Sequence, residues 1–328
     1  MLITVRSYRK RVSYDYKISL ADTPYYHIMS RCVRRSYLCG TDKLTGQSYE
    51  HRRQWIEDRI RLLSTVFAID ICSYAVMSNH YHIVIKVYPK TSKNWSFNEV
   101  IQRWPCIHKG PFLIQQYQKG DSFGVAEMKV LTRIVDDWRV RLASISEFMQ
   151  QLNQVIARQA NIEENCTGRF WEGRFKSQPL LTEAALLTAM AYTDLNSIRA
   201  KMADTLEQSE HTRIKERIKP SFNLARALDN NPDFNQRYIE RFSVKPLASL
   251  EGNVKYTNQT GVLFSHADYL TLVDTTGRIQ RQDKRGFISD TFLPILQRLA
   301  IDADEWIENT QNFEMIFYKK FNYRRKIA

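Results

Sequence analysis

The chain has 328 residues, 43% of them hydrophobic, so it can bury a sizeable core as one large domain or two modest ones. Its 48 Lys and Arg against 35 Asp and Glu give a net charge of +13, which makes nucleic acid the first partner to consider. It contains neither an apolar run of about 18 residues nor a signal-peptide core, which argues against a membrane span and against secretion. The five cysteines include no Cys-x-x-Cys pair, so a reduced, cytoplasmic compartment is expected rather than a disulfide framework or a zinc ribbon.

The first predicted elements follow a basic arm, residues 1–20. Residues 25–32 read as a strand, and a turn-rich stretch separates them from a predicted helix over 48–68. The helix places apolar side chains on one face, namely Ile56, Ile60, Leu63 and Phe67.

A hairpin is predicted next, with two histidines at the start of its second strand. Residues 69–77 read as the first strand, and only Ser78 and Asn79 separate it from the second, as in a tight turn. Alternate side chains of a strand share a face, so His80 and His82 point the same way and can reach one metal ion. An isolated His-x-His is also found as two ordinary strand histidines, and the pair alone leaves both interpretations open.

Residues 89–143 interrupt this pattern with Pro and Gly, and they predict an insertion with little regular structure before about residue 126. A helix over 144–161 resumes the core. Residues 169–177 then alternate charged and aromatic side chains, which fits an amphipathic edge strand and a nucleic-acid face equally well. The order of elements predicts an α+β fold, a ferredoxin-like antiparallel sheet backed by helices.

The best helix signal of the chain lies over 182–202. Thr182 can cap this helix, and an apolar stripe runs along it. Tyr192 and Asn196 stand four residues apart, so both can project into one cleft. Taken alone, the pair is more simply explained as a tyrosine at the edge of the core and a solvated asparagine.

Beyond residue 204 the sequence becomes more polar, and the charged stretch 213–220 predicts a boundary before a mainly helical, basic C-terminal region. Helices are predicted over 292–299 and 304–321. Residues 274–278 read as a turn leading into basic residues, with a nucleic-acid role and a plain surface loop equally favoured.

Three segments together, residues 80–82, 168–176 and 192–200, follow the order of motifs in single-tyrosine HUH transposases. More closely, the chain resembles the REP-associated tyrosine transposases of bacteria, over roughly residues 20–203. Two positions depart from the family pattern, because Ser197 replaces the usual proline and Tyr81 replaces the usual aliphatic residue between the histidines. Neither change removes a catalytic atom.

The resemblance implies a transposase domain over 21–203, with His80, His82 and Asn196 binding Mg²⁺ or Mn²⁺. It implies that Tyr192 cleaves single-stranded DNA at or near a hairpin and forms a 5′-phosphotyrosine, whose reversal joins strands. A free phenol, with a pKa of about 10, is a poor nucleophile at neutral pH, so the chemistry needs the metal ion. Basic side chains in or near these segments and in the C-terminal region are candidate DNA contacts: Arg31, Arg169, Arg174, Lys176, Arg199, Arg278, Lys284 and Arg285.

Two other functions remain open. One is a domesticated protein that binds hairpin DNA or RNA without cutting it, and the other is a basic protein with a structural metal. The sequence also leaves open whether the protein is a monomer or a homodimer, and whether Tyr192 serves its own subunit or a partner. The resemblance places such a protein in the bacterial cytoplasm.

Overall fold

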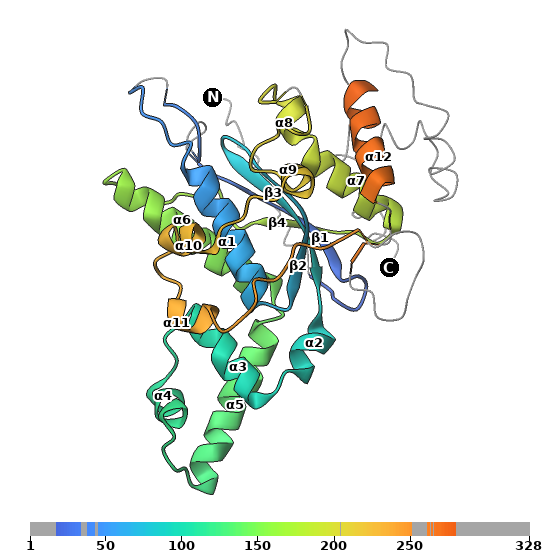
Figure 1. Ribbon diagram of the computed structural model, residues 1–328. Helices are drawn as coiled ribbons and strands as arrows, with labels where there is room; N and C mark the ends of the chain where they lie inside the picture. The colour runs from blue at the N-terminus through green and yellow to red at the C-terminus, as the bar shows by residue number, and fades with distance from the viewer. Residues whose placement is uncertain are drawn as a thin grey trace, which may run out of the picture.

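A four-stranded antiparallel sheet with helices on both faces organises the chain in the computed structural model (Figure 1). The class is therefore α+β, as predicted. The structure describes residues 18–33, 38–42, 45–203, 205–250, 261–262, 264 and 266–279.

The sheet order is β2-β3-β1-β4, which makes the histidine strand β3 central. The strands are β1 (Tyr25–Arg31), β2 (Ile69–Val76), β3 (His80–Val87) and β4 (Lys176–Pro179). The predicted first strand and the predicted hairpin are therefore confirmed. With helices α1 (Arg52–Val66) and α6 (Ile145–Glu163), these elements follow one another as β-α-β-β-α-β.

The two faces of the sheet carry different layers (Figure 1). Helices α1 and α6 cover one face, where Tyr81, Ile83 and Ile85 of β3 belong to the larger core. Helix α7 (Glu183–Asp194) covers the other face, and Val84 belongs to its smaller core. Helix α12 (His266–Ile279) packs on α7 from the side away from the sheet, so a late segment of the chain completes this second core.

The insertion after β3 is helical, so the prediction of little regular structure was wrong. Its prolines and Gly120 do not break helices but delimit them: Pro89 begins α2, Pro111 precedes α4, and Gly120 ends α4 at a φ of 93°. Helices α3 and α5 pack together and extend away from the sheet (Figure 1). The elements are α2 (Pro89–Asn94), α3 (Phe97–Arg103), the 3₁₀ helix η1 (Trp104–Cys106), α4 (Phe112–Lys119) and α5 (Val125–Arg141).

The strand predicted over 169–177 is also largely wrong, since only its last residues belong to β4. Trp171 makes an isolated bridge to Cys32, and its indole N–H donates to the carbonyl of Asn153 at 2.8 Å. The aromatic side chains of this segment pack on the α6 side of the core, so the segment follows the edge of the core instead of pairing continuously with β1.

The helix predicted over 182–202 is divided at Leu195 into α7 and the short helix α8 (Asn196–Arg199). Thr182 caps α7 as predicted, because its side chain accepts a hydrogen bond from the backbone of Ala185. The break follows from Asn196, whose side-chain amide donates to the carbonyl of Tyr192 at 2.9 Å and thereby competes with the backbone ladder.

The C-terminal region packs against the rest of the molecule. Asp58 of α1 accepts a hydrogen bond of 2.8 Å from Asn230, which follows α10. The turn predicted over 274–278 is wrong, because these residues lie inside α12. Gly277 allows a close approach there, since a Cβ at this position would lie 3.1 Å from Leu195 Cδ2. The further helices are α9 (Arg213–Ile218), α10 (Leu224–Asp229) and α11 (Gln236–Ile239).

Some predictions fall on other parts of the chain. Most of the basic arm and the helices predicted over 292–299 and 304–321 lie outside the described residues. None of the helices that the structure describes is long and apolar enough to cross a membrane.

Candidate active site

The structure brings His80, His82 and Tyr192 together on one face of the sheet. The two histidine rings have centroids 4.9 Å apart, and the Tyr192 ring lies 5.4 Å from the His82 ring at an interplanar angle of 89°. The histidines come from β3 and the tyrosine from α7, which packs across β2 and β3. The alternation of side chains along β3 therefore gives the common face that the sequence predicted.

A third histidine, which sequence reasoning missed, completes the cluster. His27 lies on β1 opposite Val84, and its Nε2 is 3.0 Å from Nδ1 of His82. Its ring is nearly parallel to the His82 ring and 6.1 Å from the Tyr192 ring. A sequence signal existed, because alternation within residues 25–32 puts His27 on a defined face. The pairing of β1 with β3, which brings it to His82, was not visible in the sequence.

Burial keeps all three imidazoles neutral at pH 7. It lowers the pKa of His27 to about 3 and the pKa of His80 to about 4, where Arg31 adds to the effect. The pKa of His82 falls well below its usual value, first because of burial and then because of its histidine neighbours. Neutral imidazoles are the form that binds metal ions.

Hydrogen bonds indicate which ring nitrogen of His80 and of His82 has a lone pair that a metal ion could bind. His80 Nδ1 lies 2.6 Å from the side-chain oxygen of Asn79, which can only accept, so His80 donates from Nδ1 and keeps Nε2 available. If His82 likewise donates from Nδ1 to His27, its lone pair is also on Nε2. That atom is buried and has no hydrogen-bond partner among the described residues.

The donor set fits a divalent ion in part. His80 and His82 each offer an imidazole nitrogen, and Asn196 uses its amide nitrogen on helix carbonyls, which leaves its side-chain oxygen as a candidate ligand. In the described part of the chain, no three His, Cys, Asp or Glu side chains form a complete metal cage. Two imidazoles and an amide oxygen would leave coordination positions for phosphate oxygens and water, which suits Mg²⁺ or Mn²⁺ better than a closed zinc site.

A cation lies beside the tyrosine ring. The guanidinium carbon of Arg199 is 5.0 Å from the centroid of the half-buried Tyr192. Burial lowers the pKa of Arg199 to about 10, an effect opposed by Tyr192, so the guanidinium stays charged at neutral pH. Its charge favours the anionic form of the phenol over the neutral one.

The end of α7 is held in place by a buried carboxyl group. Asp194 accepts hydrogen bonds from Ser73 Oγ of β2 at 2.8 Å and from the Tyr269 hydroxyl of α12 at 2.6 Å. Burial raises its pKa, against the lowering effect of these hydrogen bonds and of nearby arginines. These contacts fix the helix that carries Tyr192 to both the sheet and α12.

The predicted DNA contacts fall into two groups. Arg31 is exposed at the end of β1, opposite His80 in the strand register, and Arg199 lies beside the tyrosine. Exposed basic side chains also occur along the segment that leads into β4: Arg169, Arg174 and Lys176. The side chain of Arg278 and the whole of Lys284 and Arg285 lie outside the described residues.

Comparisons with known proteins give one distant structural likeness. No protein-family model and no curated protein matches the sequence. A solved structure described as a REP-associated tyrosine transposase bound to a REP hairpin is similar over 64% of this chain and 88% of its own, with a TM-score of 0.37 and 9% identity. The relation is distant.

Proposed function

We propose that this protein is a metal-dependent transposase that cleaves single-stranded DNA at or near a hairpin and transfers the cut strand. The convergence of His80, His82 and Tyr192 on one face within a single chain carries the proposal. A metal-binding motif beside a nucleophile can together carry out a phosphoryl transfer through tyrosine. Because one chain contributes all three side chains, the proposal places the histidines and the nucleophile in the same subunit, whether the protein is a monomer or a homodimer.

The chain's own residues would act as follows. The Tyr192 hydroxyl oxygen attacks the scissile phosphorus and gives up its proton to water. The bond from phosphorus to the O3′ of the preceding nucleotide breaks, and this oxygen takes up a proton from water and leaves as a 3′-hydroxyl. A phosphotyrosine to the 5′ end remains, and attack by another 3′-hydroxyl reverses the step and joins strands. Arg199 favours the phenolate by its charge, and Asp194 holds α7 in position.

His80, His82 and Asn196 would hold Mg²⁺ or Mn²⁺, and the bound ion would polarise the scissile phosphate and offset its growing negative charge. His27 would orient His82 through the hydrogen bond between their rings. No nucleotide cofactor is needed, since the phosphotyrosine conserves the energy of the broken bond.

The proposal also covers the type of fold within the α+β class. The β-α-β-β-α-β order, with β1 between β3 and β4, is that of a ferredoxin-like sheet, and we infer an HUH endonuclease core within 21–203. The bacterial cytoplasm is the compartment that a transposase of this kind would need, and hairpin DNA is its proposed partner.

The decisive experiment incubates the purified protein with labelled hairpin DNA taken from the sequence flanking its gene, with Mg²⁺, with Mn²⁺ and with chelator. We expect a metal-dependent adduct that survives SDS and disappears in Tyr192→Phe, because only the nucleophilic oxygen is lost. Tyr117→Phe, on α4 and remote from the site, serves as the matched control and should form the adduct normally.

Adduct formation by Tyr192→Phe at the wild-type rate would refute the role of this tyrosine. Hairpin binding without an adduct under any metal would instead favour the protein that binds DNA or RNA without cutting it.

A further inference from the structure

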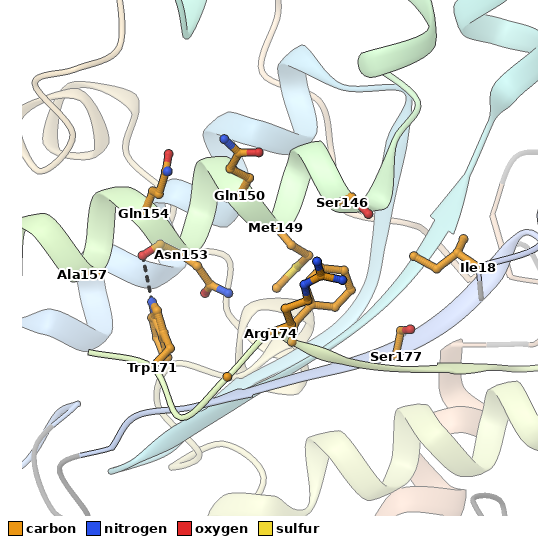
Figure 2. A pocket seen from close by; sticks show the side chains of 12 residues that line it. Ile18, Ser146, Met149, Gln150, Asn153, Gln154, Ala157, Trp171, Arg174 and Ser177 are labelled. Carbon is orange, nitrogen blue, oxygen red and sulfur yellow. Dashed lines mark hydrogen bonds between the residues drawn. The ribbon is translucent and has the colours of Figure 1, made fainter. Parts of the chain in front are cut away.

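A groove of about 950 Å³ lies on the opposite face of the sheet from the histidines, between α6 and residues 171–177 (Figure 2). Ser177 marks its floor and pairs with Ile28, whose side chain belongs to the core under α1 and α6. The catalytic steps proposed above use none of the groove's side chains, so its chemistry is a separate question.

The walls of the groove combine amides, aromatic rings and one cation. Helix α6 contributes Gln150 and Gln154, both exposed, and the facing segment contributes Trp171, Arg174 and Phe175. None of the described side chains that line the groove is a carboxylate. Figure 2 shows Arg174 and Trp171 on the segment below α6, toward which Asn153 and Met149 point, whereas Gln150 and Gln154 project from the upper rim of the helix.

This combination matches the chemistry of unpaired nucleobases. Bases that are free of a duplex stack on aromatic rings and on guanidinium planes, while amides donate to and accept from their polar edges. The absence of carboxylates among the lining residues suits a polyanion, and the volume is in the range of small-molecule sites. We propose that the groove binds unpaired bases of a single DNA strand.

The groove is joined to the histidine strand through Tyr81, the aromatic residue between the two histidines. The Tyr81 ring meets the Trp171 ring edge-on at 5.7 Å, and its hydroxyl donates to the side chain of Asn153. Asn153 in turn accepts the Trp171 indole N–H through its backbone carbonyl. Tyr81 thus has a structural reason to be aromatic, since it ties the wall of the groove to β3.

The groove also ends near the candidate active site. Trp171 bridges to Cys32, and the preceding residue, Arg31, pairs with His80. A strand held in the groove would therefore pass the exposed Arg31 at the end of the sheet before reaching Tyr192. The choice of DNA as the polymer rests on the proposed function, whereas base binding rests on the groove itself.

The test measures binding of fluorescein-labelled DNA, about 20 nucleotides long and without a hairpin, to the Tyr192→Phe protein in chelator. The triple variant Gln150→Ala, Gln154→Ala and Arg174→Ala should raise Kd about tenfold or more, because it removes amide and cation contacts on both walls. Arg133→Ala, on the exposed face of α5, removes the same charge elsewhere and should change Kd less than about twofold.

A second measurement locates the bases directly. DNA that contains 5-iododeoxyuridine should cross-link on irradiation to the peptide holding Trp171 or Phe175. Unchanged affinity in the triple variant, or cross-links only to other peptides, would overturn the proposal, and tighter binding of RNA through the same residues would overturn the choice of DNA. Cross-linking at this peptide supports the groove whether or not the wild-type protein forms the phosphotyrosine adduct, so the two proposals can fail separately.

Discussion

The two faces of the sheet are built from the same strands but bury different kinds of side chain, apolar on one face and partly polar on the other. Under α1 and α6, β3 presents Tyr81, Ile83 and Ile85, an apolar surface that contributes to stability. Under α7, the sheet presents His82, and also Gln178, whose amide nitrogen and oxygen are buried without hydrogen-bond partners in the described part of the chain. Burying such groups without partners lowers the free energy of unfolding. The α7 face is therefore less stabilising, but it carries the polar side chains of the candidate site.

The largest expected effect is on the free energy of unfolding and concerns the face of the sheet under α1 and α6. Ile83→Ala should lower the free energy of unfolding by about 2–5 kcal/mol, because Ile83 is fully buried and the cavity can only partly collapse. Urea denaturation measures this loss, and adduct formation per folded molecule should stay near the wild-type value.

Ile83→Val is the conservative control, with an expected cost of about 0.5–1.5 kcal/mol. A loss below about 1 kcal/mol in Ile83→Ala would contradict the assignment of this face as the main source of stability.

The second prediction addresses the α7 face and the unassigned third histidine. His27→Ala should weaken Mn²⁺ binding about 10- to 100-fold, because His82 loses the partner that orients its ring. Titration of the protein with Mn²⁺, in which electron paramagnetic resonance reports the free ion, measures this affinity without any DNA.

His27→Gln offers an amide oxygen to the same donor and should restore part of the affinity. If His27→Ala binds Mn²⁺ as tightly as the wild type, His27 has no role in orienting the proposed metal ligand His82.

The smallest expected effect is on how far acid lowers the free energy of unfolding, and it concerns Glu147 of α6. Burial alone raises the pKa of Glu147, but the neighbouring His108 and hydrogen bonds from Gln151 and Arg141 lower it to about 2. The stability from this carboxylate is present above pH 4.5, its unfolded value, and is lost as the pH falls from 4.5 towards 2. Between pH 6 and pH 3 the loss should be on the order of 1 kcal/mol.

Glu147→Gln should be less stable than the wild type at pH 6 and should lose less stability on acidification. Urea denaturation at both pH values measures the difference. Equal acid sensitivity of the two proteins would show that Glu147 is not the group responsible.

The sequence predicted the sheet better than its surroundings. The hairpin was visible because period-two apolar patterns flank a two-residue turn, and His80 and His82 shared a face by alternation alone. His27 reaches the same site only through the pairing of β1 with β3, a contact between residues far apart in the sequence. Local patterns do not encode such register.

Proline and glycine caused the main errors, because each has two structural uses. Pro111 predicts a break in the sequence, yet it precedes α4, just as Pro89 begins α2, and a missing N–H costs little at the start of a helix. Gly277 was interpreted as part of a turn, but it lies in a helix that comes close to Leu195. A glycine in a turn and a glycine at a close contact inside a helix differ only in the neighbouring helix, which the local sequence does not show.

The link from Asp194 to Tyr269 has a practical consequence for dividing the chain. A fragment that stops at residue 203, where the motifs of the sequence end, would keep the histidines and Tyr192 but leave Asp194 without one of its two hydroxyl donors. It would also uncover the apolar surface of α7 that Leu272 and Val273 now cover, which invites aggregation during expression. A fragment meant to keep this site intact should therefore extend through α12.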